Sequence, residues 1–335
     1  MLFRSVFVLL LATLMPVAAS AQSTPVLNVY THPSFASDWG PGPAVKEAFE
    51  AQCQCILDYT VLESGGDILQ RLRLEGRSTK ADVVLGLDTA TMEAARQTGL
   101  LAPHRISLTN LALPIEWQDT TFVPYDWGYF AFVYDTRQLP EPPASLEQLI
   151  NAPDDLKIII QDPRTSTPGL GLLLWMHAVY GDEAHARWQQ LSGKILATTQ
   201  SWSDGYYSLF MNGEAPMILS YSTSPAYHMA VDNTDRYQAA RFEEGHYLQV
   251  EVAAQVKNSG NDALGRRFLE FMLTPDFQRH IPLKNVMYPA IDLGDELPEV
   301  FHRLISPSEA LYLPPAQVAR ERRDLINTWL DAMTR

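Results

Sequence analysis

The sequence predicts an α/β protein of two lobes joined by two long crossing strands. Short apolar runs alternate with helical patterns along most of the chain, which is typical of βαβ units around a mostly parallel sheet. The chain has 335 residues, and one domain usually takes about 100–200. Its hydrophobic content of 46% supplies apolar side chains for two cores and argues against disorder.

Strand and helix patterns alternate in both halves of the chain. The first half has strand patterns at 27–31, 56–62 and 81–87 and helical patterns at 44–51 and 68–75. The second half resumes with strand patterns at 157–161 and 217–221, a helical pattern at 168–180 and a terminal helical pattern at 316–333. Each half therefore predicts one α/β lobe, and the apolar face of the terminal helix favours packing on a core over binding a partner.

Two longer segments predict the crossings between the lobes. Residues 121–134 are rich in aromatic and β-branched side chains, and apolar residues nearly alternate in 246–256. Two crossings make a hinge, and a ligand site is expected in the cleft where the carboxyl ends of the strands face each other. The predicted division is a signal peptide at 1–21, the first part of lobe 1 at 22–124, lobe 2 at 125–250, and a return to lobe 1 with C-terminal helices at 251–335.

The first residues predict an export signal. Arg4 precedes an apolar run at 6–14, and Ala19-Ser20-Ala21 supplies a cleavage site of small residues. A membrane anchor is disfavoured, because the run is shorter than the ~20 apolar residues that span a bilayer. We therefore expect cleavage and a mature chain that begins near Gln22.

The net charge of −14 bears on the choice of partner. Nucleic acids and anionic membranes are bound through summed Lys and Arg contacts, so both are disfavoured. A cationic solute is compatible with this charge.

The two cysteines, Cys53 and Cys55, flank Gln54. An exported chain meets an oxidising compartment, where a disulfide between them is plausible. Too few other ligands lie nearby for a metal site. A structural bridge is therefore favoured over a metal or redox function.

Well-marked catalytic motifs do not occur in the sequence. It has no Gly-x-Ser-x-Gly elbow, no His-Glu-x-x-His pair and no Gly-x-x-x-x-Gly-Lys-Ser/Thr loop. The eight histidines are scattered, without the local spacing of a metal site. We expect no metal, no cofactor and no enzyme of these classes, while a triad built from distant residues stays open.

A helix start between a buried strand and an apolar helix is the first candidate binding element. Its sequence is DPRTSTPG, residues 162–169. Thr167 is suited to cap the helix and Pro168 to its first turn. The amides of such a turn stabilise a phosphate or hydroxyl, so ligand binding and simple capping both stay open.

Aromatic and hydroxyl side chains gather in the second candidate element. Trp202, Tyr206 and Tyr207 precede the run YSTSPAY, residues 221–227, at a strand-to-helix junction. Aromatic faces enclose a flat cation with ~0.5–2 kcal/mol per face, and hydroxyls orient its polar rim. Core packing is the alternative for any one of these rings.

At these residues the chain resembles the periplasmic thiamine-binding proteins of bacterial thiamine ABC importers. The likeness runs along essentially the whole mature chain. It includes the segments SFASDWGPGP (34–43), KADVVLGLD (80–88), GYFAFVYD (128–135) and QDPRTSTPGLGLLLWM (161–176).

The resemblance implies a type II periplasmic-binding-protein fold, no catalysis, and thiamine, thiamine monophosphate and thiamine diphosphate as ligands. It also implies a periplasmic location, with the membrane permease and the ATPase of the importer as partners. A shuttling protein of this kind is usually a monomer. By position, the ligand contacts of the family fall on Ser64, Gly65, Ser166, Thr167, Trp202, Tyr221, Ser222, Thr223, Ser224 and Tyr227.

Three positions depart from the relatives. His32 stands where they carry a tyrosine and Val286 where they carry a tryptophan. Loss of two aromatic faces removes roughly 1–4 kcal/mol of stacking. Ser64 replaces an acidic residue, for which Glu63 is a candidate substitute. We expect the ligand class to be kept while the affinity or the preference among phosphate forms shifts.

Two other functions fit the same outline. Ferric-ion capture would use the neighbouring Tyr206 and Tyr207, whose flanking sequence instead matches the thiamine-binding family. An exported thiamine-degrading enzyme on a similar scaffold would need an activated nucleophile, for which cysteine is the usual choice. Both cysteines lie in one early segment where they can be oxidised, so this function is also disfavoured.

Overall fold

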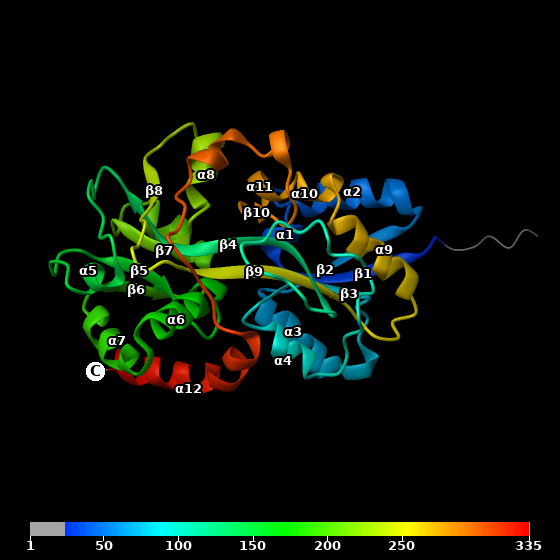
Figure 1. Ribbon diagram of the computed structural model, residues 1–335, viewed down its shortest axis with the longest axis horizontal. Helices are drawn as coiled ribbons and strands as arrows, with labels where there is room; N and C mark the ends of the chain where they lie inside the picture. The colour runs from blue at the N-terminus through cyan, green and yellow to red at the C-terminus, as the bar shows by residue number, and fades with distance from the viewer. Residues whose placement is uncertain (1–23, 335) are drawn as a thin grey trace, which may run out of the picture.

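The computed structural model describes residues 24–334 and shows one mixed sheet that runs through the whole molecule, with helices on both faces (Figure 1). The strand order is β2-β1-β3-β9-β4-β7-β5-β6; β8 and β10 also pair with β4, and β11 pairs with β9. The signal peptide predicted at 1–21 lies outside the described residues. Within residues 24–334, none of the helices has the length and apolar character needed to cross a bilayer.

The main strands lie where the apolar patterns predict them, to within two residues at each end. The bounds are β1 Val26–Thr31, β2 Ile56–Val61, β3 Val83–Asp88, β4 Phe122–Asp135, β5 Ile158–Gln161, β6 Ile195–Thr199, β7 Met217–Tyr221, β8 Tyr237–Ala239, β9 His246–Gln255, β10 Tyr288–Pro289 and β11 Ala310–Leu311. The patterns missed β6, β8, β10 and β11. The first is a partly exposed edge strand, and the others have only two or three residues.

The helices are of very different lengths. Their bounds are α1 Pro33–Ala36, α2 Gly42–Cys53, α3 Gly65–Glu75, α4 Met92–Arg96, α5 Leu146–Ile150, α6 Thr167–Tyr180, α7 Ala184–Ser192, α8 Ser224–Ala230, α9 Asp262–Met272, α10 Pro275–Gln278, α11 Ile281–Lys284 and α12 Pro315–Met333. A π-helical turn covers Asp204–Phe210. Helices α2, α3, α6 and α12 were predicted. Most of the missed helices are too short to show a period, but α9 has as many residues as α3 and was also missed.

The pairing directions turn two sets of strand ends toward each other. β1, β2 and β3 are parallel, and so are β5, β6 and β7. β9 is antiparallel to both β3 and β4, and β4 is antiparallel to β7. The two parallel sets therefore run in opposite directions, and the carboxyl ends of both point toward the middle of the sheet.

The two predicted crossings are confirmed as β4 and β9. β4 pairs with β9 over residues 122–129 and with β7 over residues 130–134. β9 pairs with β3 over residues 251–255 and with β11 at residues 246–247. Each strand therefore has one end in each half of the molecule, as a hinge requires.

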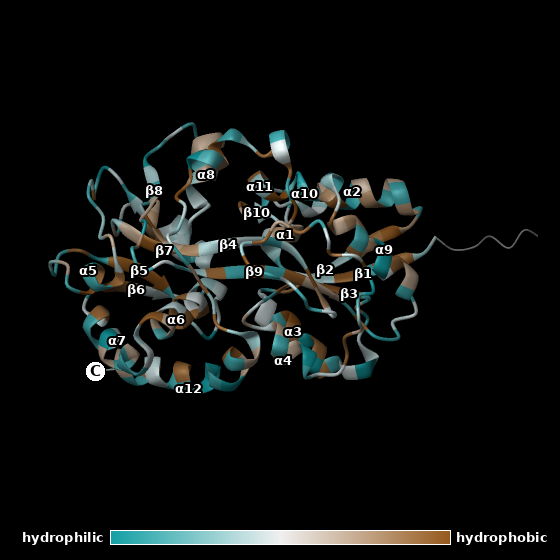
Figure 2. Ribbon diagram, in the orientation of Figure 1, coloured by the Kyte–Doolittle hydropathy of each residue, from teal (hydrophilic) through white to brown (hydrophobic). Residues whose placement is uncertain are grey.

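Each half has apolar clusters against its part of the sheet. In the first half, one cluster joins the strands to α2 and α9 and another joins them to α3 and α4. In the second half, the largest cluster includes α6, α7 and α12. Figure 2 shows apolar residues concentrated along the central strands and hydrophilic residues on the outer helices. This layering is typical of two α/β units.

The terminal helix α12 packs mainly on the second half, as a core-facing helix. Trp329 lies edge-on to Trp188 of α7, with 6.5 Å between ring centres, and Val318 and Ala332 belong to the same buried cluster. The helix also touches α4 of the first half. The predicted lobe boundaries at 124, 250 and 335 stay a prediction.

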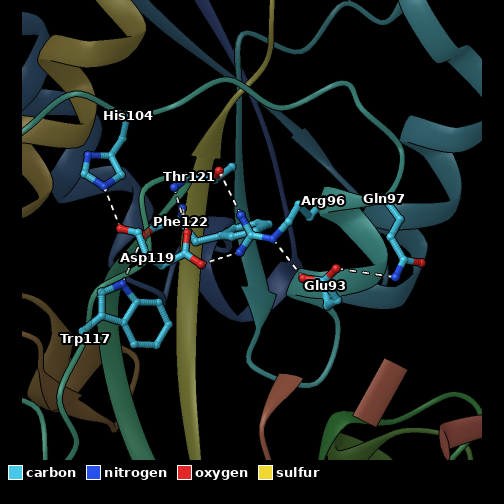
Figure 3. A network of polar contacts seen from close by, with 8 residues as sticks. All are labelled: Glu93, Arg96, Gln97, His104, Trp117, Asp119, Thr121 and Phe122. Carbon is cyan, nitrogen blue, oxygen red and sulfur yellow. Dashed lines mark hydrogen bonds and ion pairs between the residues drawn. The ribbon is translucent and has the colours of Figure 1, made fainter. Parts of the chain in front are cut away.

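One polar network holds the connection between α4 and β4 (Figure 3). Arg96 donates to Glu93 and Thr121 and pairs with Asp119, and its guanidinium lies 5.1 Å from the centre of the Phe122 ring. Asp119 also accepts the amides of Thr121 and Phe122, at 2.7 and 2.8 Å. The network fixes the residue at which the first crossing strand begins.

His246 begins the second crossing strand as a buried neutral side chain. Its Nδ1 donates to the carbonyl oxygen of Phe130 at 2.8 Å, and its Nε2 accepts the amide of Phe242 at 3.0 Å. Burial lowers the pKa of His246 from its ordinary 6.5 to about 4. The bond from the Phe242 amide requires the uncharged imidazole, whereas the bond to Phe130, which ties β9 to β4, is compatible with either form.

We expect acid to destabilise the protein through His246. The unfolded chain takes up a proton as the pH falls below 6.5, whereas the folded chain keeps His246 neutral down to about pH 4. The free energy of unfolding should drop by on the order of 3 kcal/mol across this window, and urea unfolding at stepped pH values measures it. His246→Gln should lose this share of the pH dependence. An unchanged pH dependence in the variant contradicts the assignment.

Candidate functional site

The second half of the molecule brings most of the predicted site residues to one set of strand ends. Ser166 and Thr167 follow β5, Trp202 follows β6, and Tyr221 ends β7 directly before α8. β5 pairs with both β6 and β7, so these ends are neighbours in the sheet. Tyr227 lies one turn into α8. The structure therefore groups these residues around the carboxyl ends of three parallel strands.

Helix α6 begins at the predicted cap residue, one residue earlier than predicted. Ser166 is the N-cap and Thr167 is the first helical residue, so the prediction that Thr167 caps the helix is wrong. The reason lies in the backbone: the amide of Ser166 bonds to the carbonyl of Asp162, and the amide of Leu170 bonds to the carbonyl of Ser166. In the described structure, the Ser166 hydroxyl makes no capping hydrogen bond. The Ser166 hydroxyl is thus not used to cap the helix.

The loop before α6 is fixed from both sides. Burial tends to raise the pKa of Asp162, but hydrogen bonds from Arg164 hold it below its ordinary value. A Cβ on Gly169 would lie 2.4 Å from the carbonyl oxygen of Gln161. Only glycine therefore allows the first turn of α6 to lie this close to the end of β5.

Trp202 is held by a stack and a hydrogen bond. Its ring stacks on Tyr206 at 4.8 Å between centres, and Tyr207 lies edge-on to it at 5.5 Å. Its indole N–H donates to the Ser220 hydroxyl at 2.8 Å. The ring is half-buried, so it keeps a fixed orientation and an accessible part.

Tyr221 stands where the two halves meet. It packs on Phe130 at 5.1 Å between ring centres and lies against apolar clusters of both halves. Ser224 accepts the amide of Tyr221 at 3.3 Å. The hydroxyl of buried Ser222 has no hydrogen-bond partner among residues 24–334. Across the junction, the Thr223 hydroxyl lies 4.0 Å from the Met287 sulfur.

The first half contributes the start of α3. Ser64 caps this helix by accepting the amide of Asp67 at 3.2 Å, and its hydroxyl donates to the Asp67 carboxylate at 2.6 Å. A Cβ on Gly65 would lie 2.4 Å from the carbonyl oxygen of Gly86. Gly65 thus lets α3 approach β3 closely, while the Ser64 hydroxyl is already engaged within the helix.

The two departures from the expected aromatic residues lie in the first half. His32 follows β1, and its ring lies 2.2 Å from the position of a Cβ on Gly86. Its Nε2 is 3.8 Å from Glu251. Val286 adopts a left-handed backbone with φ of 55°, which is unfavourable for a β-branched residue, directly before Met287. His32 and Val286 are thus placed near the junction without adding the predicted aromatic faces.

Sequence reasoning missed a row of three acids at the junction. Asp88 of β3, Glu251 of β9 and Asp126 of β4 are direct partners in neighbouring strands. Burial raises the pKa of Asp126 well above its ordinary value, and the charge of Glu251 adds to the effect. The sequence did offer a signal for them, because each of these acids stands alone within an otherwise apolar strand pattern.

Comparison with known proteins places the chain in a class. Residues 78–312 match the family model described as "Bacterial extracellular solute-binding protein". A "Thiamine-binding periplasmic protein" of Salmonella typhimurium is 52% identical over 318 residues, which cover 95% of this chain and 96% of that protein. A solved "Periplasmic thiamin binding protein" superposes with a TM-score of 0.89 at 50% identity, covering 94% of this chain and 98% of that one.

The chain is a bacterial extracellular solute-binding protein with the two-lobed type II fold that the sequence predicts. Within that class it belongs to the family of the periplasmic thiamine-binding proteins. Iron-bound HitA from Pseudomonas aeruginosa superposes with a TM-score of 0.75 at 18% identity, over 92% of this chain and 99% of that one, and shares the fold alone.

The packing behind Tyr221 depends on a glycine in α6. A Cβ on Gly171 would lie 2.1 Å from the ring of Phe130, on which Tyr221 rests. Gly171→Ala should therefore lower the free energy of unfolding by ~1–3 kcal/mol, measured by urea unfolding. Gly193→Ala is the matched control, because the nearest atom to its Cβ is 4.0 Å away. Equal stabilities of the two variants would show that Phe130 moves aside at no cost.

Proposed function

We propose that this chain captures thiamine, thiamine monophosphate and thiamine diphosphate in the periplasm and delivers them to the permease and ATPase of an ABC importer. The observation that carries the proposal is the group of aromatic and hydroxyl side chains at the ends of β5, β6 and β7. Near-complete coverage at about half identity with proteins named for thiamine binding supports it. We further propose that the chain acts as a monomer and without catalysis.

The proposed binding mode follows from the geometry of the second half. The flat thiazolium cation lies against Trp202, Tyr221 and Tyr227, whose faces attract a positive ring. The phosphate end meets Ser166, Thr167 and the first amides of α6, where the helix dipole favours an anion. Hydroxyls from Ser222 to Ser224 line the space between, and Ser64 with Gly65 closes the site from the first half. Bending of β4 and β9 closes the halves on the ligand.

Two contacts argue against the alternative functions. Tyr206 is 2% exposed, and its hydroxyl lies 2.9 Å from Nε2 of His228 inside the second half, so it is poorly placed to hold an iron ion. Cys53 and Cys55 are joined in a disulfide, which removes the thiol that a thiamine-degrading nucleophile would use. A solute-binding role accounts for the site without either chemistry.

Isothermal titration of ligand-stripped protein tests the proposal directly. Heat with thiamine or either phosphate ester is expected, and no heat from a folded protein overturns it. Trp202→Leu should weaken thiamine binding by roughly 2- to 30-fold, because one cation–π face is lost. Tyr180→Leu, which removes an aromatic ring at the far end of α6, serves as the control and should bind like the wild type.

The start of α6 should discriminate among the ligand forms. Ser166→Ala with Thr167→Val removes two hydroxyls expected to bind phosphate, and hydrogen bonds to a charged group contribute about 1.5–3 kcal/mol. With both bonds lost, affinity for thiamine monophosphate should fall by roughly 100- to 10,000-fold, while affinity for thiamine changes little. Competition between the two ligands measures the ratio. An equal loss for both places the phosphate elsewhere.

A further inference from the structure

The row of acids at the junction occupies the middle of the hinge. Asp88, Glu251 and Asp126 are cross-strand partners on β3, β9 and β4. Asp88 is 6% exposed and Asp126 is fully buried, while the Glu251 side chain is 14% exposed. Three carboxyl groups thus lie side by side where both crossing strands pass between the halves.

The groups around Glu251 are mostly neutral. Tyr125 donates to Glu251 at 2.8 Å, Gln249 donates to it at 3.3 Å, and Asn285 donates to both Glu251 and Asp126. His32, at 3.8 Å, is the one side chain in the described residues that forms an ion pair with Glu251 if protonated. Across the described chain, neither Lys nor Arg pairs with Glu251 or Asp126. Glu251 and Asp126 therefore lack a fixed counter-ion among the described residues.

Two acceptor atoms beside Glu251 lack a donor. Oδ1 of Asp126 and Oε1 of Gln249 are buried and have no hydrogen-bond partner in the part of the chain described. A buried acceptor without a donor is costly, and so is a second negative charge beside the first. A proton held between the carboxyl groups of Asp126 and Glu251 gives Oδ1 of Asp126 a hydrogen-bond partner and removes one of the two negative charges. The raised pKa of Asp126 agrees with this. Oε1 of Gln249 is still without a donor among the described residues.

We propose that Asp126 and Glu251 share one proton in the ligand-free protein and release it when a cationic ring binds against Glu251. The proton passes to solvent, and the positive charge of the ligand takes its place. The total charge of the acids with their bound proton before binding therefore equals that of the acids with the bound ligand afterwards. The identity of the ligand rests on the proposed function above. The row then makes a positively charged solute a requirement for tight binding.

The position of Glu251 suits this role. Burial raises the pKa of Asp88, and the negative charge of Glu251 raises it further. The same two causes raise the pKa values of Tyr125 and Tyr221. Tyr221 belongs to the opposite half and is one of the rings proposed to hold the cation. Arg322 of α12 faces Asp88 from below, and its charge favours ionised Asp88. The charge of Glu251 therefore acts on groups from both halves of the molecule.

Proton release is measurable by calorimetry. Thiamine is titrated at neutral pH in buffers of different ionisation enthalpy, and the slope of the observed enthalpy gives the protons released. We expect about 0.5–1 proton to be released per thiamine bound. In the pH range where the free carboxyl pair holds its proton and the ligand-bound pair does not, the affinity for thiamine should rise by up to about tenfold per pH unit. Difference infrared spectra of the wild type should show loss of a protonated carboxyl band on binding. Zero release together with an unchanged carboxyl band overturns the inference.

Variants separate the groups that titrate. Glu251→Gln and, as a second choice if it folds poorly, Asp126→Asn should abolish the release, and Glu251→Gln should weaken thiamine binding at pH 8 by about tenfold. Glu244→Gln changes a half-buried acid of the second half whose pKa burial raises and which accepts the amide of Leu146, and it should leave the release unchanged. His32→Gln should also retain it. Release that persists in Glu251→Gln but vanishes in His32→Gln assigns the proton to His32 and overturns the inference.

The experiments distinguish failure of the shared proton from failure of the proposed function. Thiamine that binds without releasing a proton refutes the shared proton and leaves the proposed function standing. No heat with thiamine or either ester refutes the proposed function and, with it, this inference.

Discussion

The antiparallel pairing of β4 with β9 is the constraint on which the other contacts between the halves depend. Each strand ends in a different half, and their register from Phe122 with Ala254 to Tyr129 with Leu248 carries the sheet across the junction. The irregularity between Pro124 and Asp126 shifts this register by one residue. Because side chains alternate between sheet faces, that shift decides which face Asp126 presents.

The hinge also connects the aromatic and hydroxyl side chains of the second half to the acidic row. Tyr221 rests on Phe130, the residue of β4 at which pairing passes from β9 to β7. His246 bonds to the carbonyl of that same Phe130. A bend of β4 near this point would move the ends of β5, β6 and β7 as one body, because the stacks and hydrogen bonds that hold Trp202 and Tyr221 all lie within the second half. The aromatic set is thus held largely by contacts of its own half.

Much of the fold could be predicted because it follows from local patterns. The long strands and helices carry a clear apolar period, and the segments of mixed character such as β6 do not. The grouping of Trp202 with Tyr221 could be predicted because aromatic and hydroxyl side chains gather in both segments, although the strand before Trp202, β6, was missed. The acids could not, since Asp88, Asp126 and Glu251 are brought together only by cross-strand register, which no single segment encodes. The start of α6 was misplaced by one residue because Thr167 and Ser166 are both good caps and tertiary contacts of Asp162 decide between them.

The exchange of an expected tyrosine for His32 changes more than a stacking face. His32 lies against Gly86 and 3.8 Å from Glu251, so its ring abuts the acidic row and faces the same carboxylate that a cationic ligand would approach. A protonated imidazole there competes with the ligand for one negative charge, whereas a neutral imidazole leaves that charge available. A tyrosine at this position would offer a π face and remain neutral. The substitution therefore places an imidazole, in place of a phenol ring, next to the acidic row.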